Sequence, residues 1–418
     1  MYTTISHCRI CGNEHLESLL DLGTQALTGV FPKKKETDVP VGPLELVKCR
    51  DDGSDHTCGL VQLKQTFHPD EMYGMNYGYR SGLNRSMVTH LQKKAEKIKT
   101  LVSLNPADLI LDIGSNDSTL LRAMDGPGLQ LVGMDPTGVK FREFYPSHIA
   151  LIPDFFSAGR FRQEFGQRSA KVVTSIAMFY DLEAPLEFVK QIHEILADDG
   201  VWVFEQSYLP TMLARTSYDT ICHEHAEYYA LKQILWILNR TGFVLRDVEL
   251  NDINGGSFSI TASKKSVRHA KNGASVEQLL NEEKQLALDS SAIYDQFREQ
   301  VFRHRHELQQ FLRNARANGE KIFGYGASTK GNVILQFSGI TADELPCIAD
   351  VNSDKFGSFT PGTKIPIVSE EEARAQNPSG FLVFPWHFRD SIIARENAFL
   401  ANGGKLIFPL PRIEVVGN

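Results

Sequence analysis

The fold is decided by the stretch Leu109-Ile110-Leu111-Asp112-Ile113-Gly114-Ser115-Asn116-Asp117, an apolar run that ends at an acidic residue and a turn of small residues. This is the pattern of a buried strand followed by a sharp turn. Helical stretches and further β-rich runs alternate around it, and the further runs lie at 129–134, 149–152, 172–177 and 201–205. Strands that alternate with helices at this spacing form a parallel sheet with helices on both faces, so we expect a doubly wound α/β domain here.

Length and composition narrow the class of protein. A chain of 418 residues is long enough for several domains, because single cores stop growing at roughly 250 to 300 residues, and we expect three. A net charge of -7 gives no general attraction to nucleic acid, which is not an expected partner. No apolar run approaches the roughly 20 residues that span a bilayer, and the N-terminus has no signal pattern. We therefore expect no membrane partner and a cytoplasmic location.

Cysteine is concentrated at the start of the chain. Six cysteines are too few for a disulfide scaffold at this length, and four of them fall within the first 58 residues. These four are Cys8, Cys11, Cys49 and Cys58. Four thiolates suit one tetrahedral Zn²⁺ and leave no position open for water, so the predicted zinc is structural. The alternatives are four reduced thiols, or a site in which His7 or His56 replaces one thiolate.

The last third of the chain begins a second α/β unit. Residues 275–318 carry apolar side chains at helical spacing, which predicts one or two amphipathic helices that end at Gly319. Residues 321–332 then predict a strand, a tight glycine turn and the start of a helix. The three expected domains are 1–72, 73–265 and 266–418.

The turn after the first central strand is a candidate cofactor site. Asp112 lies near the end of the strand, and the small residues from Gly114 to Asn116 let the backbone approach a ligand. The pattern lacks the three spaced glycines of a dinucleotide fingerprint. It resembles the first motif of class I methyltransferases, in which S-adenosylmethionine lies over the turn. Asp135 ends the next strand, about 20 residues on, where a carboxylate accepts hydrogen bonds from ribose hydroxyls; the alternative is a helix cap.

Two further segments are candidates for contact with the same cofactor. The rings of Phe155 and Phe156, which follow Asp154, can pack on adenine, and the alternative is that they belong to the core. The fourth strand ends at the edge where such sheets bind ligands. The candidates there are Ser175, Met178 and Tyr180. We expect Tyr180 to face the cofactor or the substrate, whereas Met178 suits packing equally well.

The densest group of proton-transfer side chains is Cys222-His223-Glu224-His225-Ala226-Glu227-Tyr228-Tyr229, with two imidazoles, two carboxylates and two phenols. Such a density indicates an active site. A metal site is the alternative interpretation of His-Glu-His. Histidine pairs that bind metal on a helix are usually four residues apart, so the adjacent alternation seen here suits a strand or a loop.

Taken together, the motifs resemble those of the three-domain sugar C-methyltransferases, in the same order and over nearly the whole chain. They are Cys8-x-x-Cys11 with Cys49 and Cys58, Gly114-Ser115-Asn116-Asp117, Met178-Phe179-Tyr180-Asp181, His223-Glu224-His225, Asn254-Gly255-Gly256-Ser257 and Gly324-Tyr325-Gly326-Ala327. The sequence departs from the family pattern at Ser118, where glycine is usual, and at Cys222, where some relatives have a tyrosine.

The resemblance implies an α/β protein of three parts. These are a small zinc-binding N-terminal domain, a class I methyltransferase domain with a Rossmann-like fold that binds S-adenosylmethionine, and a C-terminal Rossmann-like α/β domain. The last of these closes over a sugar nucleotide in the family. The resemblance also implies methylation of a carbon, usually C3, of a nucleotide-diphosphate-linked 4-keto-6-deoxyhexose.

Such a reaction assigns roles to the cluster around His225. A sugar carbon attacks a methyl group only after it loses a proton beside a carbonyl, so a base and a group that stabilises the enolate are needed. His225 is the predicted base, because neutral imidazole accepts a proton at physiological pH. Glu224 is predicted to orient the sugar or an imidazole, and His223 to polarise the ketone oxygen; simple burial is the alternative for each histidine. The candidate hydroxyl donors to the keto-sugar are Tyr77, Tyr79 and Tyr180, with packing as the alternative for Tyr77.

The remaining substrate candidates lie beyond residue 250. The resemblance makes Asn254 a sugar contact, and the alternative is that it only forms a tight turn. Helix N-terminal amides after Gly326 can face a diphosphate, to which Lys330 adds charge. Asp350, about 24 residues on, fits a ribose contact. The other candidates for nucleotide or sugar contact are Tyr325, Asn332 and His387.

Other functions fit the same motifs. An O-methyltransferase needs the same base but no ketone, and an epimerase or dehydratase uses the enolate without methyl transfer. A non-catalytic protein that binds sugar nucleotides is a third alternative. The predicted function is a sugar C-methyltransferase with S-adenosylmethionine and structural zinc as cofactors, and the sequence specifies neither the nucleotide nor an oligomeric state.

Overall fold

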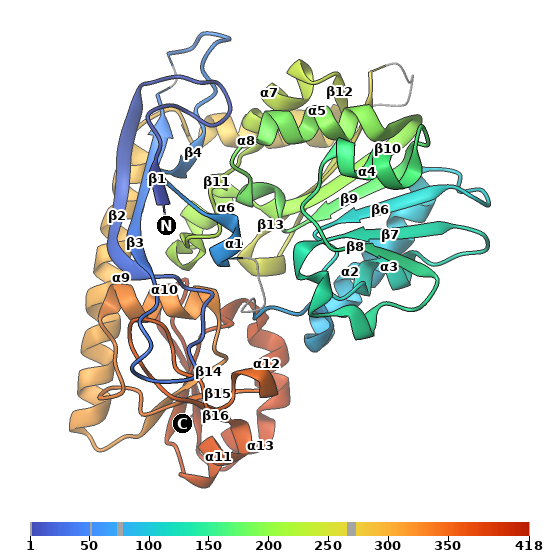
Figure 1. The fold of residues 1–418 in the computed structure, drawn as a ribbon. Helices are drawn as coiled ribbons and strands as arrows, with labels where there is room; N and C mark the ends of the chain where they lie inside the picture. Colours follow the sequence, from blue (N-terminus) through green and yellow to red (C-terminus); the bar gives the residue numbers. More distant parts are fainter. Residues whose placement is uncertain (1, 51, 73–77, 266–272, 418) are drawn as a thin grey trace.

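The computed structural model describes residues 2–50, 52–72, 78–265 and 273–417, and its strands form three large sheets and a small one (Figure 1). The predicted α/β class is confirmed, with a Rossmann-like sheet in the centre and a cysteine cluster near the N-terminus. The predicted domain borders lie next to segments outside the described residues, and they stay a prediction.

The N-terminal region is mainly β-structure. Its larger sheet has the order β11-β4-β3-β2, and β1 pairs with β5 in a two-stranded sheet. The elements are β1 (Tyr2–Thr4), β2 (Leu16–Ala26), β3 (Val41–Cys49), β4 (Val61–Leu63), β5 (Gln65–Phe67), α1 (Pro69–Met72) and β11 (Glu227–Tyr228). Strand β11 belongs to the central third of the sequence, so that region contributes an edge strand to the N-terminal sheet.

The central region is a seven-stranded sheet in the order β12-β13-β10-β9-β6-β7-β8. Strands β6 to β10 are parallel, and each overlaps one of the predicted apolar runs. Strand β13 is antiparallel to both of its neighbours. The strands are β6 (Leu109–Ile113), β7 (Gln130–Met134), β8 (Ile149–Ile152), β9 (Ala170–Ile176), β10 (Leu196–Ser207), β12 (Phe243–Asn251) and β13 (Ser257–Lys264). The helices are α2 (Arg85–Leu101), α3 (Thr119–Met124), α4 (Ala158–Phe165), α5 (Pro185–Ile195), α6 (Leu209–Ala214) and α7 (Leu231–Arg240).

The order of the strands marks where this sheet can hold a ligand. The chain runs from β6 outward through β7 to β8, and it then returns to β9 on the other side of β6. Open α/β sheets bind ligands outside the carboxyl ends of the strands at such a reversal. The predicted cofactor turn follows β6 and therefore lies at this point.

The C-terminal region is a second α/β sheet in the order β16-β15-β14-β17-β18-β19, preceded by the predicted amphipathic helices. Its strands are β14 (Ile322–Tyr325), β15 (Ile348–Asp350), β16 (Ile367–Ser369), β17 (Gly380–Val383), β18 (Lys405–Phe408) and β19 (Glu414–Val416). Its helices are α8 (Gly273–Gln285), α9 (Ala292–Ala317), α10 (Thr329–Ser338), α11 (Glu370–Ala375), α12 (Arg389–Arg395) and α13 (Asn397–Ala401). The long helix α9 runs beside β2 and ends at the C-terminal sheet (Figure 1).

Shared cores hold the three regions together. Leucines of β2 and β3 pack in one continuous apolar core with α9 and the C-terminal strands. Cys8, Cys49 and Cys58 pack in another with residues of the central sheet. The N-terminal region thus shares buried apolar surface, the main source of folding free energy, with both of its neighbours.

Short 3-10 helices carry several site residues at the ends of strands. They are η1 (Ser81–Leu83), η2 (Pro136–Val139), η3 (Arg142–Phe144), η4 (Phe179–Asp181), η5 (Tyr218–Thr220), η6 (Ile253–Gly255), η7 (Ser353–Lys355) and η8 (Trp386–Phe388).

Among the helices that the structure describes, none is both long and apolar enough to cross a bilayer.

Candidate active site

A cavity of about 380 Å³ lies at the carboxyl edge of the central sheet. Its walls include the ends of four parallel strands, through Asp112, Gly114, Asp135, Met178 and Glu205. This is the reversal between β6 and β9, so the cavity and the predicted cofactor turn coincide.

Backbone geometry explains the small residues of this turn. Gly114 has a φ of 72°, and a Cβ built there would lie 3.2 Å from Met178 Cγ. A larger residue would be strained and would crowd the cavity. Ser118 also has a left-handed φ, of 61°, at the position where the family resemblance leads us to expect glycine. Its Oγ donates a hydrogen bond to Phe144 O at 2.8 Å, which offsets part of the cost of that conformation.

Asp135 caps a helix, as one of its two interpretations predicted, and it also holds the cofactor turn, while its contact with a ribose stays a prediction. Its Oδ2 accepts a hydrogen bond from Asn116 N at 2.7 Å, which fixes the cofactor turn. Its Oδ1 accepts from Thr137 N and Oγ1, both at 2.6 Å, so the same carboxylate also caps η2. Asp350 is arranged alike in the C-terminal sheet, where it accepts from Ala327 N and from Asn352 N, both at 2.7 Å.

This similarity supplies a matched pair of variants. Asp135→Ala is expected to weaken the binding of S-adenosylhomocysteine about 10-fold to 100-fold, because a charged acceptor that holds the turn contributes about 1.5–3 kcal/mol. Asp350→Ala removes an equivalent carboxylate outside the cavity and is expected to leave that affinity within about twofold of the wild-type value. Isothermal titration calorimetry on both variants checks this. Equal losses in the two variants would contradict the placement of the cofactor.

We expect the binding of S-adenosylmethionine to depend on pH through Asp112. The side chain is buried, accepts a hydrogen bond from Thr174 Oγ1 at 2.6 Å, and has a pKa that burial raises to about 7. The carboxyl is therefore mostly protonated at pH 6 and mostly ionised at pH 8. Because a cationic ligand favours the ionised form, the affinity for S-adenosylmethionine should rise about tenfold over that interval. Titrations at several pH values test this, and Asp112→Asn should remove the slope; a flat wild-type profile would contradict it.

The other predicted cofactor residues divide into two groups. Phe155, Phe156 and Met178 line the cavity. Asp154, Ser175 and Tyr180 are placed outside its described lining. The Asp154 side chain is largely exposed, Ser175 Oγ accepts a hydrogen bond from a buried tryptophan, and Tyr180 packs against His225 with ring centroids 4.3 Å apart. Of the predicted tyrosines, Tyr79 lines the cavity, and Tyr77 lies outside the described residues.

Sequence reasoning missed Glu205, at the carboxyl end of β10. This buried carboxylate lines the cavity and accepts hydrogen bonds from His90 at 2.6 Å and from Asn251 at 2.8 Å, and it forms an ion pair with Lys94 at 2.7 Å. Its neighbours lower its pKa despite burial, chiefly through the hydrogen bond from His90. Glu205 ends a predicted strand, as Asp135 does, so the feature that identified Asp135 could also have identified Glu205.

The cysteine cluster has the geometry of a tetrahedral metal site. Cys8 and Cys58 have Sγ atoms 3.5 Å apart, as do Cys11 and Cys49, and all four sulfurs lie within 4.8 Å of one another. A Zn–S length of about 2.3 Å puts the sulfurs of a tetrahedral zinc about 3.8 Å apart. Asn13 Nδ2 also donates to Cys49 Sγ at 3.4 Å, which suits a thiolate. These four thiols therefore fit zinc and would hold it with no position left for water.

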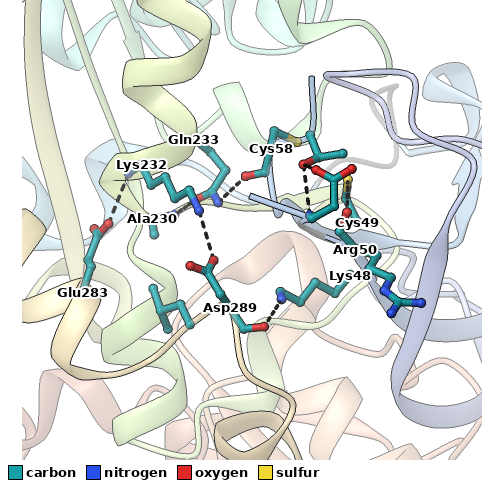
Figure 2. A network of polar contacts seen from close by, with 12 residues as sticks. Lys48, Cys49, Arg50, Cys58, Ala230, Lys232, Gln233, Glu283 and Asp289 are labelled. Carbon is teal, nitrogen blue, oxygen red and sulfur yellow. Dashed lines mark hydrogen bonds and ion pairs between the residues drawn. The ribbon is translucent and has the colours of Figure 1, made fainter. Parts of the chain in front are cut away.

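Polar contacts join this cluster to helix α7, as Figure 2 shows. Gln233 Nε2 donates to Cys58 O at 2.8 Å. Lys232 pairs with Asp289 at 3.0 Å, and Lys48 Nζ donates to the carbonyl oxygen of Asp289 at 3.0 Å. Glu283, from α8, accepts from Lys232 N at 3.1 Å near the start of α7. The zinc-binding segment is thus fixed to the helix that follows the His-Glu-His turn.

The His-Glu-His turn leads directly into β11, which pairs with β4, so Glu227 lies opposite Gln62 in the N-terminal sheet. The alternation therefore lies in a turn and not on a helix, as predicted. His223 is buried against Phe67, with Nδ1 3.4 Å from Thr28 Oγ1 and Nε2 3.5 Å from Gly42 O. Burial lowers its pKa to about 4.

Glu224 is also turned toward the N-terminal region. Its Oε2 accepts a hydrogen bond from Thr28 Oγ1 at 3.2 Å, and burial raises its pKa. A Cβ at Gly29 would collide with Glu224 Oε1, so a larger residue there would displace the Glu224 carboxylate. The neighbouring Cys222, at the departure from the family pattern, is fully buried, and burial raises the pKa of its thiol.

His225 has a different environment from His223. Its Nδ1 lies 2.8 Å from Thr220 O, and a carbonyl oxygen only accepts, so Nδ1 carries the proton and Nε2 keeps its lone pair. Burial, and then the charge of Lys330, lower the His225 pKa to about 3. The imidazole is therefore neutral at physiological pH and has one nitrogen able to accept a proton.

The C-terminal region completes this cluster. Lys330 Nζ donates to Asn254 O at 2.6 Å, and Asn254 also lines the cofactor cavity. Trp386 Nε1 donates to Asp219 Oδ2 at 2.8 Å, which joins η8 to the loop before His225. The segment 386–388 was a candidate for contact with the nucleotide or sugar, but the pairing of Trp386 with Asp219 gave no sequence signal, because the two residues are 167 positions apart.

The other predicted substrate residues have partners of their own. Asn332 Nδ2 donates to Thr28 O at 2.7 Å, which brings α10 to the N-terminal region. Tyr325 is buried within the C-terminal region, and its hydroxyl donates to Glu396 at 3.0 Å. Asp350 is occupied by the two backbone amides described above. The structure thus gathers Glu224, His225, Asn254, Lys330 and His387 near one junction of three regions, and it places Tyr325 elsewhere.

Three family models match successive parts of the chain. Residues 8–73 match "Putative zinc binding domain", 87–248 match "Methyltransferase domain", and 252–411 match "C-methyltransferase C-terminal domain". Their order is the order of the cysteine cluster, the cofactor cavity and the second α/β sheet.

The chain is also similar to individual proteins. The C-methyltransferase NovU of Streptomyces niveus is 29% identical over 416 residues, which are 99% of this chain and 97% of the relative. Among solved structures, the mitomycin 7-O-methyltransferase MmcR is 14% identical, with a TM-score of 0.35 over 44% of this chain and 55% of its own. An S-adenosylmethionine-dependent methyltransferase from Mesorhizobium loti is 15% identical, with a TM-score of 0.33 over 41% of this chain and 99% of its own.

Proposed function

We propose that this chain is an S-adenosylmethionine-dependent C-methyltransferase with a zinc-binding domain, which the family matches and the similarity to NovU support. We further propose that it methylates a carbon beside the ketone of a nucleotide-diphosphate-linked 4-keto-sugar. The proposed carbon is C3, and the proposed base is His225. The sugar nucleotide follows from the resemblance of the motifs to those of the sugar C-methyltransferases.

The observation that carries the proposal is the position of His225 near the cofactor cavity. Its ring packs on Tyr180, and Asp181, the next residue, lines the cavity. The hydrogen bond from Nδ1 to Thr220 O leaves Nε2 as the proton acceptor. A base placed there can take a proton from a carbon that faces the methyl donor.

The chemistry explains why a base is needed. S-adenosylmethionine supplies an electrophilic methyl group when bound. A sugar carbon becomes nucleophilic only when it loses a proton next to a carbonyl, which spreads the negative charge onto oxygen. The protein must accept the proton and stabilise that charge, and general-base catalysis contributes about 10²-fold to 10⁴-fold to such a step.

Turnover of defined substrates tests the proposal. The purified protein is incubated with methyl-labelled S-adenosylmethionine and with thymidine, cytidine or guanosine diphosphate linked to a 4-keto-6-deoxyhexose. We expect label in the sugar of at least one of them, in a form that resists acid and base hydrolysis. A labile methyl ether would indicate an O-methyltransferase. Exchange of solvent deuterium into the sugar without any methylated product would indicate an epimerase or dehydratase.

A further inference from the structure

The proposed reaction needs a group that stabilises the enolate, and the position of His223 leaves that role open. The His223 ring is buried against Phe67, and its two nitrogens approach Thr28 and Gly42 of the N-terminal region. Both nitrogens thus have partners in the protein. A donor that acts on the ketone has to come from another part of the cluster.

Lys330 is placed to fill this role. It lies in the first turn of α10, and its Nζ donates to the backbone oxygen of Asn254, a residue that also lines the cofactor cavity. The charge of Lys330 lowers the pKa of both His225 and His387, so the ammonium is within electrostatic range of the proposed base. An ammonium has three donors, and Asn254 O accepts from one of them.

We propose that Lys330, supplied by the C-terminal region, donates a hydrogen bond to the ketone oxygen of the substrate and stabilises the enolate formed by His225. This inference rests on the proposed function. In the step, the C–H bond beside the ketone breaks and its proton moves to His225 Nε2. The electron pair of that bond forms a carbon–carbon double bond, and the π pair of the ketone moves onto the oxygen. The negative oxygen then lies close to the cations of Lys330 and protonated His225.

The surroundings of Lys330 favour this role over contact with a diphosphate, the role that its sequence position suggested. Asp219 is completely buried nearby, and its charge acts on Lys330. A carboxylate beside the ammonium would repel the several negative charges of a diphosphate. A ketone oxygen develops only one negative charge, so the carboxylate repels it less. Asp219 is held by Trp386, so the counter-charge has a fixed place.

Two buried polar atoms beside Lys330 also indicate that a ligand belongs here. Within the part of the chain that the structure describes, Asp219 Oδ1 and His387 Nδ1 have no hydrogen-bond partner. Buried polar atoms in native proteins are nearly always paired, and an unpaired one calls for an explanation, such as a catalytic role or a missing water or ion. A hydroxylated sugar offers both donors and acceptors for them.

The low basicity of His225 also favours a role for Lys330 in stabilising the enolate. A histidine whose pKa is about 3 is a weak proton acceptor, and the charge of Lys330 is one cause of that low value. When a ketone oxygen takes up negative charge beside Lys330, the electrostatic penalty on protonating His225 falls. Lys330 therefore links the charge on oxygen to the basicity of the imidazole.

Deuterium exchange isolates this step from methyl transfer. Wild-type protein and variants are saturated with S-adenosylhomocysteine in D₂O, and deuterium entry beside the ketone is followed by NMR with the sugar nucleotide that the wild-type protein methylates. Lys330→Met is expected to lower the saturating exchange rate about 10²-fold to 10³-fold, with little change in the KM for the sugar nucleotide. Lys330→Arg keeps the charge and should recover part of the rate.

Two further variants keep the test decisive. Lys355→Met removes another lysine of the C-terminal region, one that donates to Ala327 O at 2.7 Å, and should leave the exchange rate within about threefold. If Lys330→Met does not fold, the double variant Asp219→Asn/Lys330→Met removes both buried charges and is tested instead. A raised KM with an unchanged exchange rate in Lys330→Met would overturn the proposal and favour diphosphate binding. If the wild-type protein neither exchanges nor methylates any of the sugars, it is the proposed function that fails.

Discussion

Replacement of His225 by asparagine is expected to lower the rate of methyl transfer about 10²-fold to 10⁴-fold, the usual contribution of a general base. Asparagine can still donate a hydrogen bond to Thr220 O, as His225 Nδ1 does at 2.8 Å, but it offers no basic nitrogen. The binding of S-adenosylhomocysteine should stay within about twofold, because His225 is absent from the described lining of the cofactor cavity. Steady-state kinetics and calorimetry measure the two quantities.

The adjacent histidine is the matched control. His223→Asn removes an imidazole that packs on Phe67 and contacts the N-terminal region. We expect it to lower thermal stability and to reduce the rate by less than about tenfold. The factor lost in His225→Asn should also be similar at pH 6 and pH 8, because a pKa near 3 keeps the imidazole neutral over that interval. Equal rate losses in the two variants would contradict the assignment of the base to His225.

Removal of zinc is the second change with a large expected effect. Structural zinc contributes an apparent binding free energy of about 10–16 kcal/mol in small domains, which exceeds the usual stability of a domain. Treatment with a strong chelator should therefore unfold the segment around Cys8, Cys11, Cys49 and Cys58. We expect methyl transfer to fall by at least about 100-fold, and metal analysis to find one zinc per chain before treatment and none after it.

Loss of zinc is expected to lower activity because the cysteine cluster is connected to the segment that holds His225, the proposed base. Cys58 is followed closely by β4, and β4 pairs with β11, which begins two residues after His225. Gln233 Nε2 donates to Cys58 O from the helix after β11 (Figure 2). Loss of zinc should therefore loosen β11 and α7, the two elements that follow the His-Glu-His turn, whereas the cofactor turn after β6 keeps its own hydrogen bonds.

A cysteine outside the cluster tests whether the effect belongs to the metal. Cys347→Ala removes a buried thiol just before β15 in the C-terminal region and should keep both zinc and activity. Cys58→Ser should lose zinc and most activity. A chelated protein that is free of zinc and fully active would contradict a structural role for the metal at this site.

Much of the central fold could be predicted because its information is local. The strand from Leu109 to Ile113 and the turn at Gly114 follow from an apolar run and small residues, and the structure has both. The helices before the C-terminal sheet follow from apolar side chains at helical spacing, and they also form. Asp135 and the four cysteines were found because residue type and spacing restrict what such residues can do.

What could not be predicted depends on pairing across long distances. No local pattern shows that β11, from the central region, joins the N-terminal sheet, because the register with β4 is set by tertiary packing. Asp219 meets Trp386 across 167 residues, a pairing that no local pattern indicates. His223 and His225 are two residues apart in sequence, yet the turn between them sends one ring toward Phe67 and the other toward Tyr180.

The most direct test of the central claim is the position of the transferred methyl group. The protein is supplied with ¹³C-methyl S-adenosylmethionine and a nucleotide-linked 4-keto-6-deoxyhexose, and the product is examined by ¹³C and ¹H NMR. We predict a methyl carbon bonded to the sugar carbon beside the ketone, with the loss of that carbon's proton to solvent. A labelled methyl group bonded to oxygen, with the proton beside the ketone retained, would contradict the account.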